Sequence, residues 1–260
     1  MFSLSLPSSI DGIKEKKWSR IVKCSNNCLY CIPHSANEIL KIDPSINKTT
    51  LVGGEYVGMW KWSNGFAHGD FVYGIQLFAS HFFKYNIETE TSELVGDDFA
   101  DDYKWMSGAV ADDGCLYCFP YKHKIIVKFN PNNDTTSFVG EEFRPSYRFN
   151  GTIKAKNGCL YGILFCFYQT MCVAKFHVAT QKVTFIGDNY GNGFGRPVWE
   201  GGVVGDDDNI YGIPFQQNVW SKINIATETT SLVANHIPIL GTQEHKACFS
   251  SGVIGEDCNI

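Results

Sequence analysis

The sequence predicts an all-β protein, a β-propeller of four-stranded antiparallel blades with five full repeats and the start of a sixth. The first observation is a recurring segment that reads NNCLYCIP, GDFVYGIQ, DGCLYCFP, NGCLYGIL and DDNIYGIP. Its tyrosines are Tyr30, Tyr73, Tyr117, Tyr161 and Tyr211, at intervals of 43, 44, 44 and 50 residues. The second is that each repeat holds four short runs rich in Val, Ile, Tyr, Phe and Thr, separated by turn residues such as Asp-Gly and Asn-Gly. Four strands per repeat of about 40 to 50 residues is typical of a propeller blade.

Two further landmarks recur at fixed places around the tyrosine. An aromatic residue precedes it by about twelve residues, at Trp18, Trp62, Trp105, Phe149 and Trp199. A lysine follows it within the third run of each repeat, at Lys41, Lys84, Lys128, Lys175 and Lys222. Because the lysine alternates with apolar neighbours, we expect it to lie on one consistent face and to pair with an adjacent blade or strand.

The repeats define the expected organisation of the chain. Residues 1–16 form an N-terminal segment that could supply a closing strand, and the blades approximate to 17–60, 61–103, 104–147, 148–197 and 198–245. Residues 246–260 repeat the beginning of a blade, with Phe249 at the aromatic position. Two interpretations stay open, a five-bladed ring closed by an extra strand or a fragment of a longer propeller. The interrupted motif favours the fragment slightly.

The order of turn, aromatic strand and Lys-Ile-Asp-Pro-like strand resembles the repeats of kelch-type and NHL-type propellers and of the virginiamycin B lyase group. The resemblance covers residues 17 to 260. It departs from the kelch pattern, since Gly-Ile-Pro or Cys-Ile-Pro stands where kelch repeats carry a Gly-Gly doublet, and no Trp-Asp dipeptide closes the third strand. The resemblance therefore implies a divergent propeller fold and no particular activity.

Composition narrows the classes of partner and compartment. The net charge is −5 without a run of Lys or Arg, which argues against a nucleic-acid partner. No signal peptide or stretch of membrane-spanning length is recognisable, so we expect a cytoplasmic chain that does not bind a membrane. Secretion is the less favoured alternative, suggested by three Asn-X-Ser/Thr sequons at Asn47, Asn133 and Asn150.

Two motifs resemble metal sites but repeat as single blade positions. The pairs Cys28/Cys31 and Cys115/Cys118 have zinc-like spacing, yet residues i and i+3 of a strand point to opposite faces, so we expect them to pack as small buried hydrophobes. The acidic clusters are Asp112-Asp113, Asp206-Asp207-Asp208 and Glu256-Asp257. They fall in the first hairpin turn of successive repeats, where Asp is favoured by turn geometry. We therefore predict no metal site and no cofactor.

One histidine stands apart from the repeat. His68 lies in an innermost strand where other repeats carry Lys, Ala or Gly, so it is a weak candidate for a metal ligand or base without an evident partner. No phosphate loop, nucleophile elbow or His-Glu-x-x-His motif occurs. The sequence therefore offers no catalytic residues.

The non-repeating aromatic and charged residues gather in the loops that lead into each blade. In a propeller, the connections from the fourth to the first strand and from the second to the third emerge on one rim, and Trp, Tyr and Arg are common binding anchors there. The candidate binding residues are Tyr56, Trp60, Phe99, Asp101, Asp102, Tyr103, Arg144, Tyr147, Tyr190 and Arg196.

Two functions of different class follow from these observations. We expect a non-catalytic scaffold that binds a protein or peptide through the rim loops. The alternative is a lyase or hydrolase with a metal or substrate at the axial channel. Repeated sugar sites are disfavoured because the loops differ between repeats.

Overall fold

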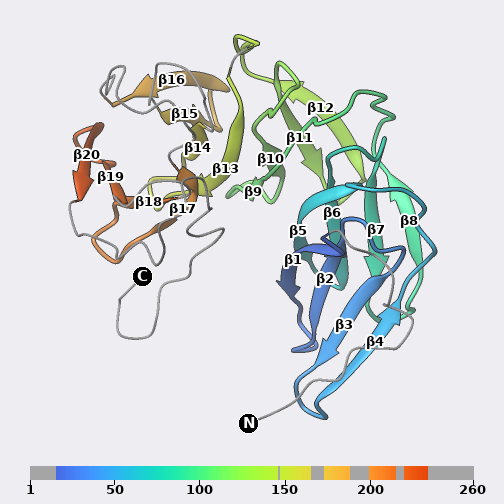
Figure 1. Ribbon diagram of the computed structural model, residues 1–260. Helices are drawn as coiled ribbons and strands as arrows, with labels where there is room; N and C mark the ends of the chain where they lie inside the picture. The colour runs from blue at the N-terminus through green and yellow to red at the C-terminus, as the bar shows by residue number, and fades with distance from the viewer. Residues whose placement is uncertain (1–15, 146, 165–172, 188–198, 215–219, 234–260) are drawn as a thin grey trace, which may run out of the picture. The chain divides into compact units, whose positions relative to one another are not determined.

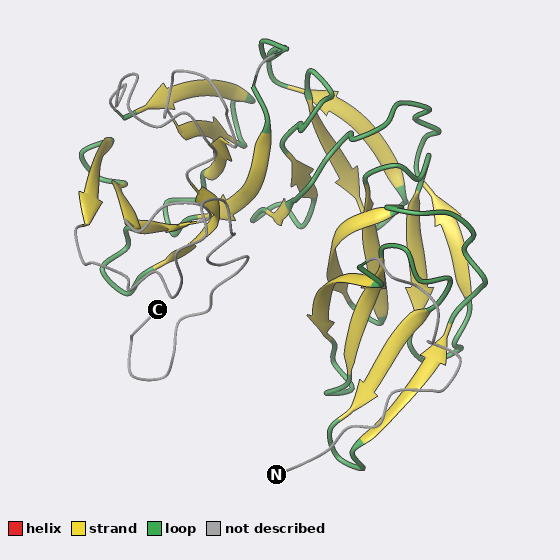
Figure 2. Ribbon diagram, viewed as in Figure 1, coloured by secondary structure: helices red, strands yellow, loops and turns green. Residues whose placement is uncertain are grey.

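The protein is an all-β molecule in a computed structural model that describes residues 16–145, 147–164, 173–187, 199–214 and 220–233 (Figure 1). Every regular element within these ranges is a β-strand (Figure 2). The predicted fold class is therefore confirmed. The proposed closing strand and the start of the sixth repeat lie outside the described residues, apart from Lys16.

The strands form five four-stranded antiparallel sheets, one for each full repeat. The first contains β1 (Trp18–Lys23), β2 (Leu29–Pro33), β3 (Ile39–Asp43) and β4 (Lys48–Val52). The second contains β5 (Trp62–His68), β6 (Phe71–Gln76), β7 (Phe82–Asn86) and β8 (Ser92–Val95). The third contains β9 (Ala109–Val110), β10 (Leu116–Cys118), β11 (Ile126–Asn130) and β12 (Thr135–Val139). The fourth contains β13 (Phe149–Lys154), β14 (Leu160–Leu164), β15 (Val173–His177) and β16 (Lys182–Ile186). The fifth contains β17 (Trp199–Val204), β18 (Ile210–Pro214), β19 (Trp220–Asn224) and β20 (Thr229–Val233). Neighbouring strands in each sheet are consecutive in sequence, as a propeller blade requires.

The chain divides into two compact units. Unit 1 comprises Met1–Ser107 with Phe129–Ser137, and unit 2 comprises Gly108–Lys128 with Phe138–Ile260. The first two blades belong to unit 1, the fourth and fifth to unit 2, and the strands of the third are divided between them.

Face-to-face packing of the first two blades forms the core of unit 1. Tyr30 and Ile32 of the first blade are fully buried in one cluster with Trp62 and Phe83 of the second. The sheets approach closely where β5 carries Gly65, because a Cβ there would lie 2.4 Å from the Ile32 side chain. Glycine at this place in the first strand therefore permits contact that no larger residue allows.

The repeat tyrosine is tied to the turn between the first two strands of its own blade. The residue four positions before it bonds to its hydroxyl in four blades: Asn26 to Tyr30 at 3.0 Å, Asp113 to Tyr117 at 2.7 Å, Asn157 to Tyr161 at 2.9 Å and Asp207 to Tyr211 at 2.8 Å. Asp113 and Asp207 also accept the backbone N–H two residues on, at 3.0 and 3.2 Å. The interpretation of these acidic residues as turn formers is confirmed.

The third-strand lysine pairs with the next blade in three cases, as the repeat predicted. Lys41 reaches Glu90 at 3.0 Å, Lys84 reaches Asp134 at 2.5 Å, and Lys175 pairs with Glu228. All three carboxylates stand at one repeat position, six residues after the lysine of their own blade, in the turn between the third and fourth strands. That position has a φ of 56° in each of the three residues.

The other two lysines find their carboxylate in their own blade. Lys128 pairs with Asp113 at 3.0 Å and Lys222 with Asp207 at 2.8 Å. For Lys128 the corresponding turn residue of the fourth blade is the neutral Gln181. Conversely, the lysines of the first and fourth blades have a carboxylate from the next blade. These two blades carry Asn26 and Asn157 at the position that Asp113 occupies in the third blade. Each lysine is thus matched by a carboxylate from one position or the other.

Asp113→Asn should lower the free energy of unfolding by about 0.5–1 kcal/mol at pH 7, the scale of a partly exposed ion pair. Asn can keep the bond to Tyr117, as Asn157 does to Tyr161, but leaves Lys128 without its carboxylate. Burial acts to raise the pKa of Asp113, yet hydrogen bonds from Tyr117 and Lys128 hold it below its usual value. Because the folded-state pKa is the lower one, the stabilisation is present above the unfolded pKa and is lost as pH falls through the folded pKa. Urea unfolding should show the difference at neutral pH and its disappearance in acid.

A second change should reverse the loss. Gln181 occupies the turn position of the fourth blade that Glu228, the partner of Lys175, occupies in the fifth. Gln181→Glu in the Asp113→Asn background therefore offers Lys128 a carboxylate from the next blade, and most of the lost stability should return. Asn157→Asp is the matched control and should change little, because Lys175 already has Glu228. Equal stabilisation by Gln181→Glu in the wild type and in the variant would contradict the pairing rule.

Candidate functional site

The rim loops of unit 1 are held to one another by backbone hydrogen bonds. The carbonyl of Lys17, just before β1, accepts the N–H groups of His34, Ser35 and Ala36 at 2.9 to 3.0 Å. One blade later, the carbonyl of Lys61 accepts those of Leu77, Phe78 and Ala79 at 2.8 to 3.2 Å. In both blades, the loop after the second strand is thereby held to the lysine that directly precedes the first strand.

The same loops are also linked from blade to blade. The N–H of Lys61 donates to the carbonyl of His34 at 2.9 Å, and the N–H of Lys104 donates to that of Leu77 at 3.1 Å. Side chains carried by these loops consequently have defined positions, which is what a preorganised binding surface needs.

Three aromatic rings meet on this rim and form what we call the aromatic cluster: Trp60, Phe78 and Tyr103. The ring centroids of Phe78 and Tyr103 are 4.3 Å apart, those of Trp60 and Phe78 5.4 Å, and those of Trp60 and Tyr103 5.9 Å. His34 extends the cluster, with its ring 6.5 Å from that of Trp60. All four side chains are partly exposed, so the cluster presents an aromatic surface to solvent.

Two members of the cluster have a backbone conformation that bulky residues rarely adopt. Trp60 and Tyr103 each have a φ of 56°, and each stands two residues before the aromatic residue that opens its blade. For large L-residues this left-handed region costs about 1 to 2 kcal/mol. Such strain at a rim aromatic points to a functional role, because glycine or asparagine would satisfy the backbone at lower cost.

Each strained residue is followed by a lysine that is buried and bound to carbonyl oxygens. Lys61 is 5% exposed, and its ammonium donates to the carbonyls of Gly58 at 2.6 Å, Ala36 at 2.9 Å and His34 at 3.3 Å. Burial lowers the pKa of Lys61 to about 8. Lys104 is fully buried, donates to the carbonyl of Asp101, and has its pKa lowered by burial. The two lysines brace the ends of the loops.

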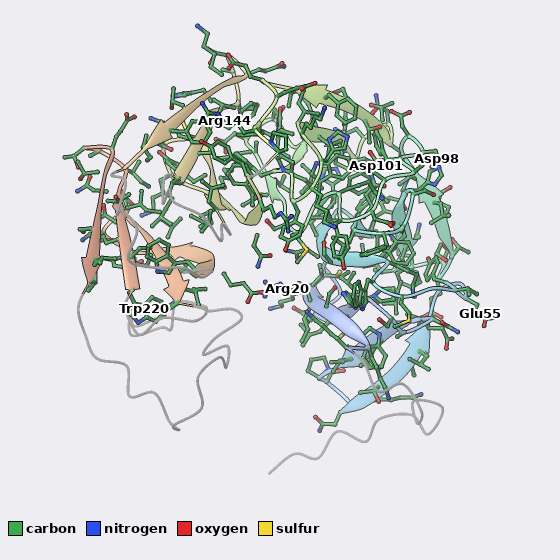
Figure 3. All side chains as sticks on the ribbon, turned by 45° about the horizontal axis from the view of Figure 1, so that its top comes forward. Arg20, Glu55, Asp98, Asp101, Arg144 and Trp220 are labelled. Atoms are coloured by element: carbon green, nitrogen blue, oxygen red, sulfur yellow. The ribbon has the colours of Figure 1, made fainter. Side chains whose placement is uncertain are left out.

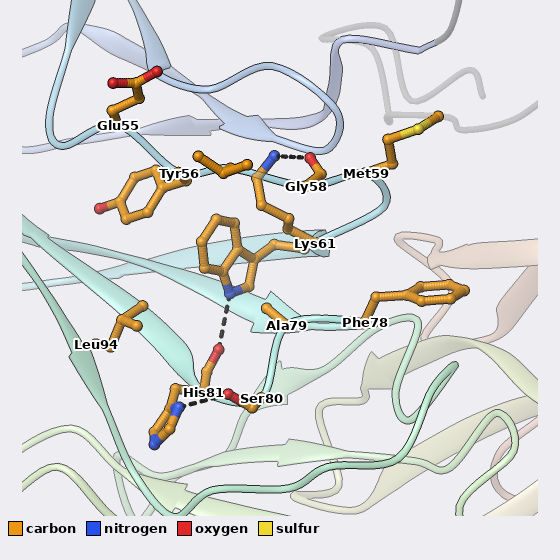
Figure 4. A pocket seen from close by; sticks show the side chains of 12 residues that line it. Glu55, Tyr56, Gly58, Met59, Lys61, Phe78, Ala79, Ser80, His81 and Leu94 are labelled. Carbon is orange, nitrogen blue, oxygen red and sulfur yellow. Dashed lines mark hydrogen bonds between the residues drawn. The ribbon is translucent and has the colours of Figure 1, made fainter.

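A pocket of about 370 Å³ lies beside the aromatic cluster and shares Phe78 with it (Figure 4). Its walls are mostly apolar, with Phe78 and Met59 on one side and Tyr56 and Leu94 on the other. Trp62 also lines the pocket and donates its indole N–H to the carbonyl of His81 at 2.9 Å. A cavity of this size and lining suits one large apolar side chain or a small ligand.

The structure separates the candidates of unit 1 into two groups. Trp60 and Tyr103 meet in the aromatic cluster, and Asp101 and Asp102 are exposed immediately before Tyr103 in the chain. Figure 3 shows Asp101 on this loop. Tyr56 and Phe99 instead pack inward onto the blade-opening tryptophans.

The ring of Tyr56 lies 4.8 Å from that of Trp62, and that of Phe99 lies 5.3 Å from that of Trp105. Burial raises the pKa of Tyr56. These two residues support the loops from below, although Tyr56 also lines the pocket.

The candidates of unit 2 are less well defined. Arg144 is exposed, and its carbonyl accepts the N–H of Tyr147 at 2.9 Å. The ring of Tyr147 packs against that of Phe185 at 5.3 Å. Tyr190 and Arg196 lie outside the described residues.

His68, the weak metal candidate, has a hydrogen-bond partner that the sequence did not reveal. It ends β5, and its Nε2 lies 3.3 Å from Oδ1 of Asn132 in the turn between β11 and β12. Within the described ranges, no three His, Cys, Asp or Glu side chains come together in a metal-binding arrangement. In the same part of the chain, no helix is long and apolar enough to cross a membrane.

The paired cysteines pack as the repeat predicted. Cys28 and Cys115 each belong to a core cluster, whereas Cys31 and Cys118, also buried, belong to neither of these clusters. Burial raises the pKa of Cys31 to about 11 and that of Cys118 well above its ordinary value. Both thiols are therefore protonated at neutral pH, as suits cysteines that pack as small hydrophobic side chains.

Sequence reasoning missed Phe78 and His34, which complete the aromatic surface. Both stand in the loop after the second strand, four or five residues beyond the repeat tyrosine. The sequence does carry a signal for them, because the loop after the second strand is expected on the same rim as the loop before the first strand.

Comparison with known proteins supports the fold. The chain is similar to virginiamycin B lyase from Staphylococcus aureus, with 9% identity, a TM-score of 0.64, and coverage of 84% of this chain and 69% of that one. A streptogramin B lyase matches with 13% identity and a TM-score of 0.62, over 87% of this chain and 70% of that one. Hydrazine synthase from Kuenenia stuttgartiensis matches with 13% identity and a TM-score of 0.64, over 88% and 69%.

These similarities establish a divergent β-propeller fold and leave the activity open, because sequence identity is low. No protein-family model matches the sequence, and no curated protein matches it.

The strained positions can be tested by replacing Tyr103 with glycine and, separately, with alanine. Both changes remove the ring, but glycine relieves the positive φ, so Tyr103→Gly should be more stable than Tyr103→Ala by about 1 kcal/mol. Phe78 provides the matched control, since its φ is not positive and the alanine variant should there equal or exceed the glycine variant. Urea unfolding of the four variants measures both differences, and the same order at both positions would disprove the strain.

Proposed function

We propose that this protein is a non-catalytic propeller scaffold that binds a protein or peptide partner through its rim loops. The observation that carries the proposal is the aromatic cluster of Trp60, Phe78 and Tyr103, partly exposed and carried on loops with defined backbone positions. Two of its members, Trp60 and Tyr103, keep an unfavourable backbone conformation of the kind that clusters at functional sites. Exposed aromatic residues on rigid loops are typical anchors of protein interfaces.

The pocket beside the cluster supports a peptide rather than a flat surface as the partner. It is about 370 Å³ in volume and is lined mainly by Tyr56, Met59, Trp62, Phe78 and Leu94. A side chain projecting from an extended segment could enter it while neighbouring residues lie on the aromatic cluster. Burial of such an anchor is the usual source of affinity in small interfaces.

An enzymatic role is the second candidate, because two of the similar structures are lyases. Their likeness to this chain rests on 9% and 13% identity and concerns the fold. His68, the residue that motivated an axial catalytic site, hydrogen-bonds Asn132. The aromatic cluster therefore gives the scaffold function the stronger support.

Selection from a random peptide library displayed on phage tests the proposal. Peptides should be enriched on the wild-type protein, and their affinity for a Trp60→Ala/Tyr103→Ala variant should fall at least about tenfold, the loss expected when hot-spot aromatics are removed. Phe138→Ala in unit 2 is the matched control, because it removes an exposed aromatic that is not among the candidate binding residues, and it should leave the affinity unchanged.

Circular dichroism of each variant verifies that the fold is retained. If no peptide is enriched, or if the selected peptides bind the double variant as well as the wild type, the rim assignment is wrong.

A further inference from the structure

The aromatic cluster can accept a ligand only on its outer surface. The ring centroids are 4.3 to 5.9 Å apart, so the rings are in direct contact and leave no gap for a group between them. A ligand must therefore contact the parts of Trp60, Phe78 and Tyr103 that solvent reaches. The negative face of an aromatic ring favours a cation or another aromatic group in this position.

The loop that ends in Tyr103 is strongly acidic. It carries Asp97, Asp98, Asp101 and Asp102 within six residues, and all four are exposed. The exposed Glu55 lies in the neighbouring loop and contributes to the pocket wall. This surface therefore combines aromatic rings with several carboxylates.

The basic side chains of these two loops are buried beneath that surface. Burial lowers the pKa of Lys104, and the charges of Asp102, Asp101 and Asp98 oppose that shift, so Lys104 offsets part of the acidic charge from below. Lys61 and Lys104 are 5% and 0% exposed, and both direct their ammonium groups at backbone carbonyls. Asp101 and Asp102 are exposed to solvent, and they directly precede Tyr103 in the chain. An anionic partner would be repelled by the carboxylates. A cationic partner would be attracted both by the carboxylates and by the aromatic rings.

We propose that the partner bound at this surface is a cationic peptide segment, an inference that rests on the function proposed above. An arginine or lysine side chain of the segment lies over Trp60 and Tyr103 with its charge near Asp101 and Asp102, and an adjacent apolar side chain enters the pocket beside Phe78. Arginine suits the site best, because its planar guanidinium stacks on aromatic rings and pairs with carboxylates at once.

Three fluorescein-labelled synthetic peptides test the charge preference by fluorescence anisotropy. They alternate leucine with arginine, with glutamine or with glutamate, and are otherwise identical. The arginine peptide should bind the wild-type protein at least about tenfold more tightly than the glutamine peptide, and the glutamate peptide should bind most weakly. The affinity of the arginine peptide should also fall as the salt concentration is raised, since exposed charges are screened.

Variants distinguish the acidic loop from general attraction to an acidic protein. Asp101→Asn/Asp102→Asn should weaken the arginine peptide about five- to tenfold and flatten its salt dependence. Glu141→Gln/Glu142→Gln removes the same charge from an exposed pair in unit 2 and should have no effect. Trp60→Phe keeps a ring and should retain most of the affinity, whereas Trp60→Ala should lose it. Urea unfolding of each variant shows whether the fold is intact.

The outcomes separate this inference from the function on which it rests. Equal binding of the arginine and glutamate peptides, or an unchanged affinity in the Asp101→Asn/Asp102→Asn variant, would overturn the cationic assignment. If library-selected peptides depend on Trp60 and Tyr103 but carry no basic residue, the cationic assignment fails while the binding function stands. If no peptide of any charge depends on those rings, both fail.

Discussion

A lysine packed between blades must keep its charge and must have a carboxylate beside it, and this requirement orders much of the repeat. The five third-strand lysines have side chains only 9% to 31% exposed, and each has an anionic partner. The partner comes from the following blade or from the lysine's own first turn. Because a partly exposed ion pair contributes about 0.5–1 kcal/mol, a blade pair is more stable when one of the two positions carries a carboxylate. The alternation of Asn157 and Asp113 therefore follows from Glu228 and Gln181.

The lysines of the rim loops are stabilised in a different way from the third-strand lysines. Lys61 and Lys104 are also buried, but their ammonium groups are satisfied by backbone carbonyls instead of carboxylates. The loops are thereby braced without drawing acidic side chains inward. Asp101 and Asp102 are exposed just before Tyr103 in the chain, where they contribute to the surface potential and also act on the charge of the buried Lys104. The same residue type is thus used for packing between blades and for shaping the loops.

Much of the fold could be predicted from the sequence because the same repeat unit occurs five times. Tyr30, Lys41 and their equivalents fall at the expected strand positions, and the cysteines and acidic turns reduce to packing and turn chemistry. The candidate site was predicted only in part. Trp60 and Tyr103 stand out as aromatics before a blade, but their contact depends on Phe78, which comes from a different loop. Their positive φ and the inward direction of Tyr56 depend on three-dimensional packing that no single-sequence pattern encodes.

The contrast between repeated and non-repeated residues also explains why the surface arises at these two blade junctions. The position two residues before the blade-opening aromatic is Trp60 in one blade of unit 1 and Tyr103 at the next junction, and both have a φ of 56°. A left-handed residue turns its side chain away from the direction that an ordinary loop residue would take. At these two junctions the rings consequently meet over Phe78, while Tyr147 packs onto Phe185. The same backbone angle at two successive junctions therefore accompanies the meeting of the two rings at one place.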